Sequence, residues 1–149
     1  MSSVRTAELP PDLRRPLPPP QRLLLASEIL SAYCRVRLRL KRDRFPIALA
    51  AVRDTGRGTR QPVDSAITYL RAARVARAVQ QILRLVPTDA RCLMQSLVLT
   101  SLLARRGIET KLVIAVRPGE EFQAHAWVKY GGQPLLPDSQ DVYQVLAEL

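Results

Sequence analysis

The sequence has few of the residues that build disulfide-stapled domains and metal centres. Its 149 residues include only two cysteines, Cys34 and Cys92, and a single histidine, His125. The cysteines lie far apart and form no CxxC pair, so the ligand set of a structural zinc site is missing. We therefore expect no metal, no cofactor and two free thiols.

Long apolar runs are missing as well. No stretch approaches the roughly 18 uninterrupted apolar residues of a membrane span. Residues 1–20 contain no apolar core of the kind that a signal peptide requires. We therefore expect a cytoplasmic protein without membrane association, in a compartment where thiols stay reduced.

The chain also lacks motifs for nucleotides and nucleic acids. It has no P-loop and no Gly-rich turn after a predicted strand. Its formal net charge is +10, from 23 Lys and Arg against 13 Asp and Glu. The basic residues are spread along the first part of the chain without aromatic interleaving, so we expect no nucleic-acid function. This charge suits solubility, or the attraction of an acidic peptide or protein.

What is present is the composition of one globular domain. Hydrophobic residues make up 47% of the chain and charged residues 24%, and the length fits a single domain. Residues 1–20 hold six of the twelve prolines. Because proline fixes φ and donates no hydrogen bond, we predict a flexible arm over 1–20 and one domain over 21–149.

The first part of the domain predicts helices. Apolar residues recur every three or four positions between Gln21 and Lys41, which indicates one buried helix face. That face holds Leu23, Ala26, Leu30, Cys34 and Leu38. We therefore expect Cys34 to be a core residue. A second helix is predicted over 64–85, where Pro87 ends it.

A third predicted helix, over 90–104, is the central element. It is apolar nearly all round, so it should be buried. Thr88 or Asp89 can cap its start by accepting hydrogen bonds from the amides of the first turn. Gly107 supplies the residue that ends it.

Beyond Gly107 the pattern changes to that of strands. Strands are predicted over 110–116 and 122–130, and Gly131-Gly132 is a hairpin turn into 133–136. Residues 142–149 are predicted as a short helix. Helices followed by a small antiparallel sheet make an α+β fold, with the helix that carries Cys92 packed on the sheet.

Cys92 is better placed for chemistry than Cys34. It falls in the first turn of the central helix, where unsatisfied amides and the helix dipole favour a negative charge. Because the thiolate is the reactive species, we expect alkylation at Cys92 but not at Cys34.

His125 is the candidate base. It lies in a predicted strand, with Trp127 on the same strand face to shield the imidazole from water. Asp138 follows the next short strand, and a hairpin return can bring its carboxylate to His125, where it would hold the right tautomer. Asp141, three residues further on, is the rival for this role.

Three short segments of sequence indicate a family. CLMQSL at 92–97, LLARRGI at 102–108 and AHAWV at 124–128 resemble the leader peptidase of lasso peptide biosynthesis, the stand-alone peptidase half of a split B protein. That family is a branch of the transglutaminase-like superfamily. The resemblance implies a transglutaminase-like, papain-like core with Cys92, His125 and Asp138 as the triad. The family usually carries an acidic residue after HAWV, whereas this chain has Lys129.

The resemblance implies that the protein removes the leader from a ribosomally made lasso precursor peptide. His125 would take the Cys92 proton, and the thiolate would attack the carbonyl that joins leader to core. A thioester would form, and water would release the leader. The backbone amide of Cys92 is a natural oxyanion donor, with Gln95 and Gln123 as candidates for the second.

The resemblance also implies partners. Fused members of the family carry a small leader-binding domain ahead of the peptidase, and this chain is too short to hold one. We therefore expect a separate leader-binding protein, and downstream an ATP-dependent macrolactam-forming cyclase.

Two other functions are open at this point. The thioester could pass to an amine instead of water, which would make the protein an acyltransferase. The chain could instead be an inert adaptor that binds a peptide, although the presence of all three triad residues argues against this.

Overall fold

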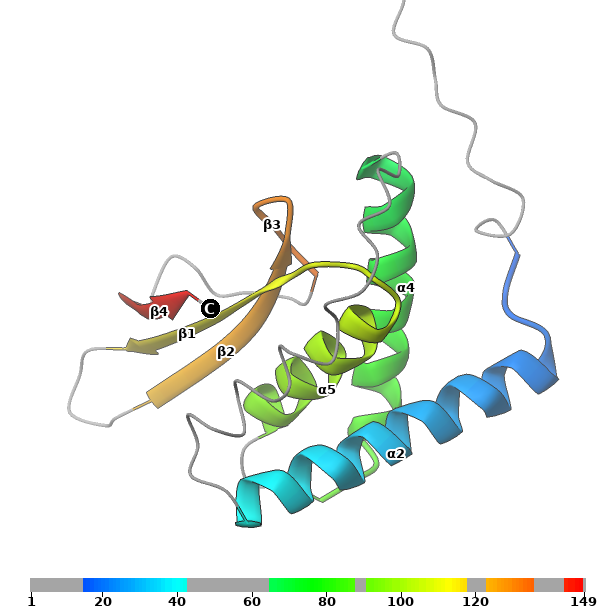
Figure 1. The fold of residues 1–149 in the computed structure, drawn as a ribbon, viewed down its shortest axis with the longest axis horizontal. Helices are drawn as coiled ribbons and strands as arrows, with labels where there is room; N and C mark the ends of the chain where they lie inside the picture. The colour runs from blue at the N-terminus through cyan, green and yellow to red at the C-terminus, as the bar shows by residue number, and fades with distance from the viewer. Residues whose placement is uncertain (1–14, 43–64, 88–90, 118–122, 136–143, 149) are drawn as a thin grey trace, which may run out of the picture.

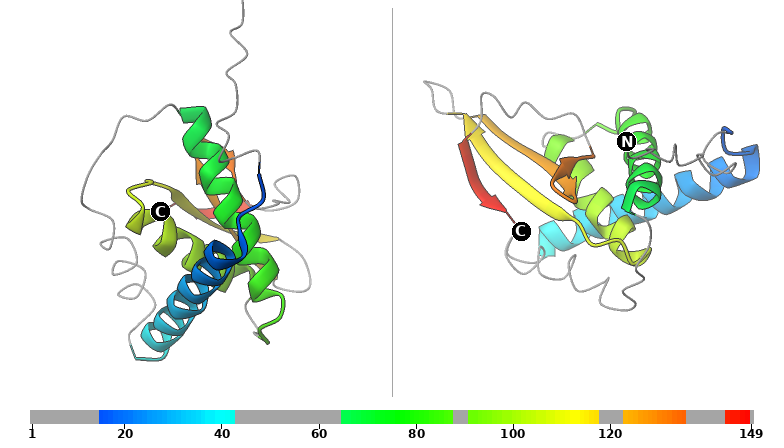
Figure 2. Two further views of the ribbon diagram at one scale, coloured as in Figure 1. Left: turned by 90° about the vertical axis from the view of Figure 1, so that its right-hand side faces the viewer. Right: turned by 90° about the horizontal axis from the view of Figure 1, so that it is seen from above.

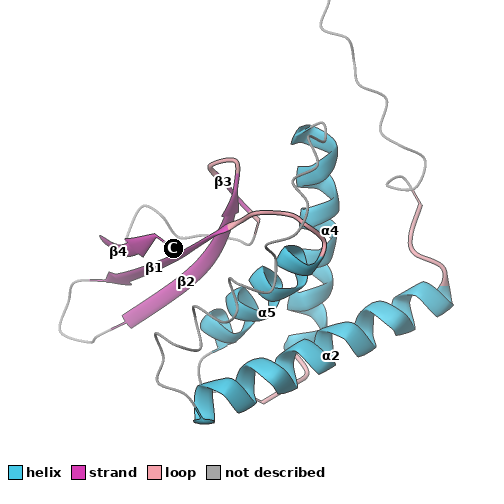
Figure 3. Cartoon of the chain, viewed as in Figure 1, coloured by secondary structure: helices cyan, strands magenta, loops and turns pink. Residues whose placement is uncertain are grey.

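The computed structural model describes residues 15–42, 65–87, 91–117, 123–135 and 144–148, and shows three helices and four strands there. The helices are α2 (Pro19–Arg42), α4 (Ser65–Leu83) and α5 (Arg91–Arg105). The strands are β1 (Lys111–Arg117), β2 (Gln123–Tyr130), β3 (Gln133–Pro134) and β4 (Gln144–Glu148). Helices precede the sheet along the chain, which confirms the predicted α+β fold (Figures 1 and 3).

Helix α2 begins two residues earlier than predicted. Pro19 and Pro20 form its first residues, and the amides of Gln21 and Arg22 donate to the carbonyl of Pro18 at 3.0 and 3.1 Å. Proline suits the first turn of a helix because the amide it lacks has no partner there. The predicted arm over 1–20 therefore overlaps the start of α2, and residues 1–14 of that arm lie outside the described part of the chain.

The buried face of α2 differs from the predicted face. The buried residues are Ile29, Ala32, Tyr33 and Val36, whereas Cys34 is exposed and Leu23, Leu30 and Leu38 are 72%, 44% and 47% exposed. Both sets recur at helical spacing, so the period alone could not select between them. The prediction of Cys34 as a core residue was wrong.

Helix α5 is the centre of the molecule. It packs against α2, α4 and β2, and nine of its fifteen residues are buried. Its end follows the prediction, because Gly107 has a φ of 71°. The amides of Gly107 and Ile108 donate to the carbonyls of Ala104 and Leu103 at 3.0 and 2.9 Å. These two bonds form a Schellman motif, which satisfies carbonyls of the last turn.

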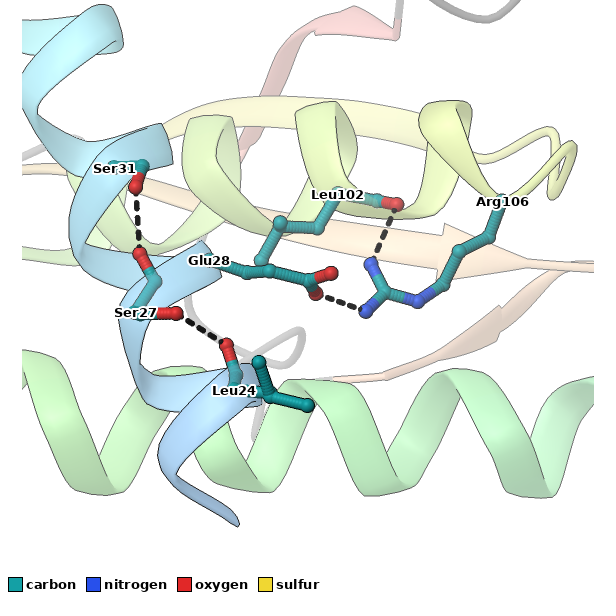
Figure 4. A network of polar contacts seen from close by, with 6 residues as sticks. All are labelled: Leu24, Ser27, Glu28, Ser31, Leu102 and Arg106. Atoms are coloured by element: carbon teal, nitrogen blue, oxygen red, sulfur yellow. Dashed lines mark hydrogen bonds and ion pairs between the residues drawn. The ribbon is translucent and has the colours of Figure 1, made fainter. Parts of the chain in front are cut away.

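A polar contact joins the end of α5 to α2 (Figure 4). The guanidinium of Arg106 donates to Glu28 of α2 at 2.5 Å and to the carbonyl of Leu102 at 3.1 Å. One arginine therefore neutralises the single acidic residue of α2 and satisfies a carbonyl near the helix terminus. Because Arg106 is one-third exposed and Glu28 is more exposed still, this pair contributes modestly to stability.

The sheet is antiparallel, with the order β3-β2-β1-β4 (Figure 2). The β2–β3 connection is the predicted glycine hairpin. Gly131 and Gly132 have φ values of 56° and 82°, as a type I′ turn requires. One sheet face places Leu112, Ala126 and Val128 in the core with the helices. The other face holds a second cluster of Val113, Ala115 and Trp127.

The last element differs from the prediction. Residues 144–148 form strand β4, which pairs with β1, and not the short helix predicted over 142–149. β2 occupies only one edge of β1, so the other edge still offers unpaired backbone groups. The β4 backbone satisfies these groups, with a shift in register between Ile114 and Ala115. Within the described residues, no helix has the length and apolar character needed to cross a membrane.

The observed face of α2 gives the first prediction. Ile29→Ala should lower the free energy of unfolding by about 2–5 kcal/mol, because Ile29 is fully buried. The neighbouring Leu30→Ala should change it by only about 0.5 kcal/mol. Urea unfolding of the two variants measures both values. A larger loss in Leu30→Ala than in Ile29→Ala would show that α2 buries the face predicted from the sequence.

Candidate active site

Cys92 lies where the sequence predicted it, in the first turn of the central helix. It is the second residue of α5, and its side chain is partly exposed. Its Sγ lies 4.0 Å from the carbonyl oxygen of Ala124, the residue before His125 in β2. The fold therefore brings the thiol against the strand that carries the only histidine of the chain.

The thiol meets β2 along the strand edge that faces away from β1. Every second residue of β2 turns its carbonyl towards the edge that faces away from β1. These residues are Ala124, Ala126 and Val128. The amide of Leu135 donates to Val128 at 2.8 Å, and the hydroxyl of Ser96 donates to Ala126 at 3.0 Å. The third carbonyl of this edge, that of Ala124, faces the Cys92 thiol.

Ser96 was not singled out as a functional residue from the sequence. It is fully buried and stands one helical turn after Cys92, so both side chains reach the same strand edge. Four residues of helix rise about 6 Å, and two residues of strand advance about 6.6 Å. These matching repeats let Cys92 and Ser96 meet Ala124 and Ala126. The signal in the sequence was a hydroxyl one turn after a cysteine in a mostly apolar helix, although Thr100 and Ser101 of the same helix carry hydroxyls too.

His125 projects from β2 on the sheet face that it shares with Trp127. The two ring centroids are 5.7 Å apart with an interplanar angle of 31°, and the Nε2 atom of His125 is buried. The predicted shielding of the imidazole by Trp127 is therefore present. The thiol approaches β2 at its edge, whereas the imidazole lies over the sheet face together with Trp127.

Lys129 stands on the same strand face as His125 and Trp127. Its Nζ lies 6.0 Å from the centroid of the Trp127 ring and 3.9 Å from a carboxylate oxygen of Glu148 in β4. Glu148 also approaches Lys111 of β1, at 3.7 Å. Glu148, an acidic residue of the last strand, thus offsets the charge of Lys129.

Several predicted site residues cannot be placed. Asp138 and Asp141 lie outside the described residues, and so do the predicted caps Thr88 and Asp89. Of the two candidates for a second oxyanion donor, Gln95 is partly buried in α5, and the side chain of Gln123 lies outside the described part. Among the described residues, no group of three or more His, Cys, Asp or Glu could hold a metal ion.

The two thiols make an internal comparison possible. Cys34 is exposed and Cys92 is only partly so, so accessibility alone would make Cys34 the faster to alkylate. That exposure removes the reason for expecting no label at Cys34. If Cys92 is activated, it should react with iodoacetamide faster than Cys34 by roughly an order of magnitude. Intact-protein mass spectrometry and peptide mapping give both rates.

His125→Ala is the control for this second prediction. It should slow the labelling of Cys92 and leave that of Cys34 unchanged, because Cys34 lies on the outer face of α2. Slower labelling of Cys92 than of Cys34 in the native protein would contradict an activated thiol.

Comparison with known proteins gives the family of this chain. The family model described as the transglutaminase-like superfamily matches residues 30–149. This superfamily includes cysteine peptidases and acyltransferases, and cysteine protease activity is common in it. No curated protein and no solved structure gives a significant match. The match covers most of the chain, which therefore belongs to the transglutaminase-like superfamily.

Proposed function

We propose that this protein is a cysteine peptidase that removes the leader from a ribosomally made lasso precursor peptide. Cys92 acts as nucleophile, His125 as base and Asp138 as the carboxylate that orients the imidazole. The observation that carries the proposal is the contact of the Cys92 thiol with the carbonyl of Ala124, one residue before His125. It supports a reacting pair built on the start of α5 and the start of β2.

The same strand edge supports a peptide substrate. The thiol is a weak donor, and at 4.0 Å it leaves the Ala124 carbonyl without a strong hydrogen bond among the described residues. β3 pairs only with Lys129 and Tyr130, further along β2. An extended peptide that donates one amide to Ala124 would present a neighbouring carbonyl carbon to the thiol, as in strand addition at a sheet edge.

The chemistry then follows from the residues. His125 accepts the proton of the Cys92 thiol, and the thiolate attacks the carbonyl carbon between leader and core. The C–N bond breaks, the core leaves as an amine after protonation by His125, and the leader stays on Cys92 as a thioester. Water attacks the thioester, His125 takes its proton, and the free leader acid departs as the thiol is restored.

A groove between α2 and α4 supports the proposed leader-binding partner. It encloses about 860 Å³, with a floor of apolar side chains such as Leu25, Ala26, Leu70 and Ile82. Arg22, Arg74 and Arg77 line it, and none of its lining residues is acidic. We assign it to an acidic segment with an apolar face on the leader-binding protein, because charge and apolar contact would act together there.

The third prediction tests the reaction. A precursor peptide mixed with this protein and its leader-binding partner should be cut at one site, and Cys92→Ala should abolish the cut while the protein stays folded. Mass spectrometry of the products also separates the other functions. A product joined to an amine would indicate acyl transfer, and retained function in Cys92→Ala would indicate an adaptor.

Matched carboxylate variants extend the same assay to the third triad residue. Asp138→Asn should lower kcat by up to about 10⁴-fold, because the amide stabilises the wrong tautomer of the imidazole. Asp141→Asn makes the same chemical change three residues away and should have little effect. A larger loss in Asp141→Asn would transfer the orienting role to Asp141.

The fourth prediction tests the groove. Arg22→Glu combined with Arg77→Glu should weaken binding of the leader-binding protein by about tenfold or more, because both side chains are exposed on the groove. Isothermal titration calorimetry measures the Kd. The control is Arg35→Glu with Arg42→Glu, which makes the same charge change on α2 outside the groove. An equal loss of affinity in both double variants would show that net charge, and not the groove, determines binding.

A further inference from the structure

The backbone carbonyls on the outer edge of β2 need hydrogen-bond donors, and β3 does not supply all of them. Three carbonyls, those of Ala124, Ala126 and Val128, point away from β1. β3 and the residue after it supply a donor only at the Val128 end. A buried carbonyl without a donor is destabilising, so the middle position needs a partner. Ser96 supplies it.

We propose that Ser96 is a positioning residue for Cys92, and that its bond to Ala126 sets where the thiol stands against β2. This inference rests on the proposed role of Cys92 as nucleophile. The Ser96 hydroxyl bonds to Ala126, and it acts on Cys92 through the helix that carries both side chains.

The bond is well placed for this role. The hydroxyl of Ser96 is buried and donates to Ala126 at 3.0 Å. The backbone carbonyl of Ser96 in turn accepts from the hydroxyl of Thr100 at 2.9 Å. Most of the buried residues of α5 are apolar, and apolar contacts allow a helix to slide because they have no preferred direction. A directional hydrogen bond fixes the helix along the strand.

The consequence for the thiol is geometric. Cys92 is one turn from Ser96 on the same helix, so a shift or tilt of the helix at Ser96 displaces Sγ from the Ala124 carbonyl. A misplacement of about 1 Å can cost about a hundredfold in rate. Removing the Ser96 hydroxyl should therefore change the reactivity of Cys92 although the two side chains need not touch.

The fifth prediction uses two matched variants in a Cys34→Ser background, which leaves Cys92 as the one thiol. Ser96→Ala and Thr100→Ala each remove one buried hydroxyl from α5, but only that of Ser96 reaches β2. The rate of Cys92 alkylation by iodoacetamide is measured from pH 5 to pH 10, a range of about five units that spans ordinary thiol titration. Thermal unfolding of each variant is followed in parallel.

We expect Ser96→Ala to change the alkylation rate by about tenfold or more, or to move the pH at which that rate is half-maximal. Thr100→Ala should stay within about twofold of the parent even if it unfolds at a lower temperature. Equal behaviour of the two folded variants would overturn the proposal, because a purely structural role predicts the same result for both.

A second variant covers the case in which Ser96→Ala does not fold. Ser96→Cys keeps the size of the side chain and a weaker donor, and peptide mapping assigns each label to its residue. Because its donor is weaker, Ser96→Cys should also change the alkylation rate of Cys92, and a parental rate in this variant would overturn the proposal.

The result is separable from the proposed function. Alkylation reports the surroundings of the Cys92 thiol and needs no peptide substrate. If Ser96→Ala alters labelling while the parent protein cuts no precursor, the positioning role holds and the peptidase proposal fails. If Ser96→Ala cuts the precursor as fast as the parent does, the peptidase proposal holds and the positioning role fails.

Discussion

The arrangement of α5 along the outer edge of β2 is the constraint on which the other features of this fold depend. The helix supplies the core through its apolar residues, and it must also satisfy the backbone of a strand that β3 covers only at one end. Ser96 meets this requirement inside the core, where a polar group without a partner would be costly. Cys92, one turn earlier, then meets the Ala124 carbonyl of the same edge.

Helix α5 also determines what its neighbours bury. α2 carries two apolar stripes at helical spacing, and the one that contacts α5 is buried while the other, with Leu23 and Leu30, remains exposed. Arg106 joins α5 to Glu28 and so favours one rotation of α2 about its axis. The sequence contains both stripes, and only the partner helix selects between them. This is why the period correctly predicted that a helix forms here but not which face it buries.

Local signals predicted most of the elements because each was contained in a short stretch of sequence. Gly107 at the end of α5 and the two glycines of the hairpin act through their own backbone geometry. Pro19 and Pro20 were assigned to the arm instead, although proline also suits the first turn of a helix. β4 had no such signal. Its five residues become a strand because β1 offers an edge about 30 residues earlier in the chain, and that pairing is tertiary.

The candidate site divides in the same way. The sequence correctly predicted that Cys92 lies in the first turn of a helix. It also predicted the strand face that His125 shares with Trp127. Three contacts could not be predicted from the sequence, because each joins two different elements. They are the contact of Cys92 with Ala124, the hydrogen bond from Ser96 to Ala126 and the ion pair of Lys129 with Glu148. The role of Asp138 remains a prediction from the sequence.

The separation of thiol and groove bears on how a partner could act. Figure 1 shows the starts of α5 and β2 at one end of the molecule, and the first turns of α2 with α4 towards the other. Within the described part of the chain, α2, α4 and the two residues Pro16 and Leu17 before α2 line the groove, with no residue of α5 or the sheet. A protein bound there would leave the edge at Ala124 open to a peptide. Binding could then raise the local concentration of substrate without entering the chemistry, which is the advantage of a tethered second site.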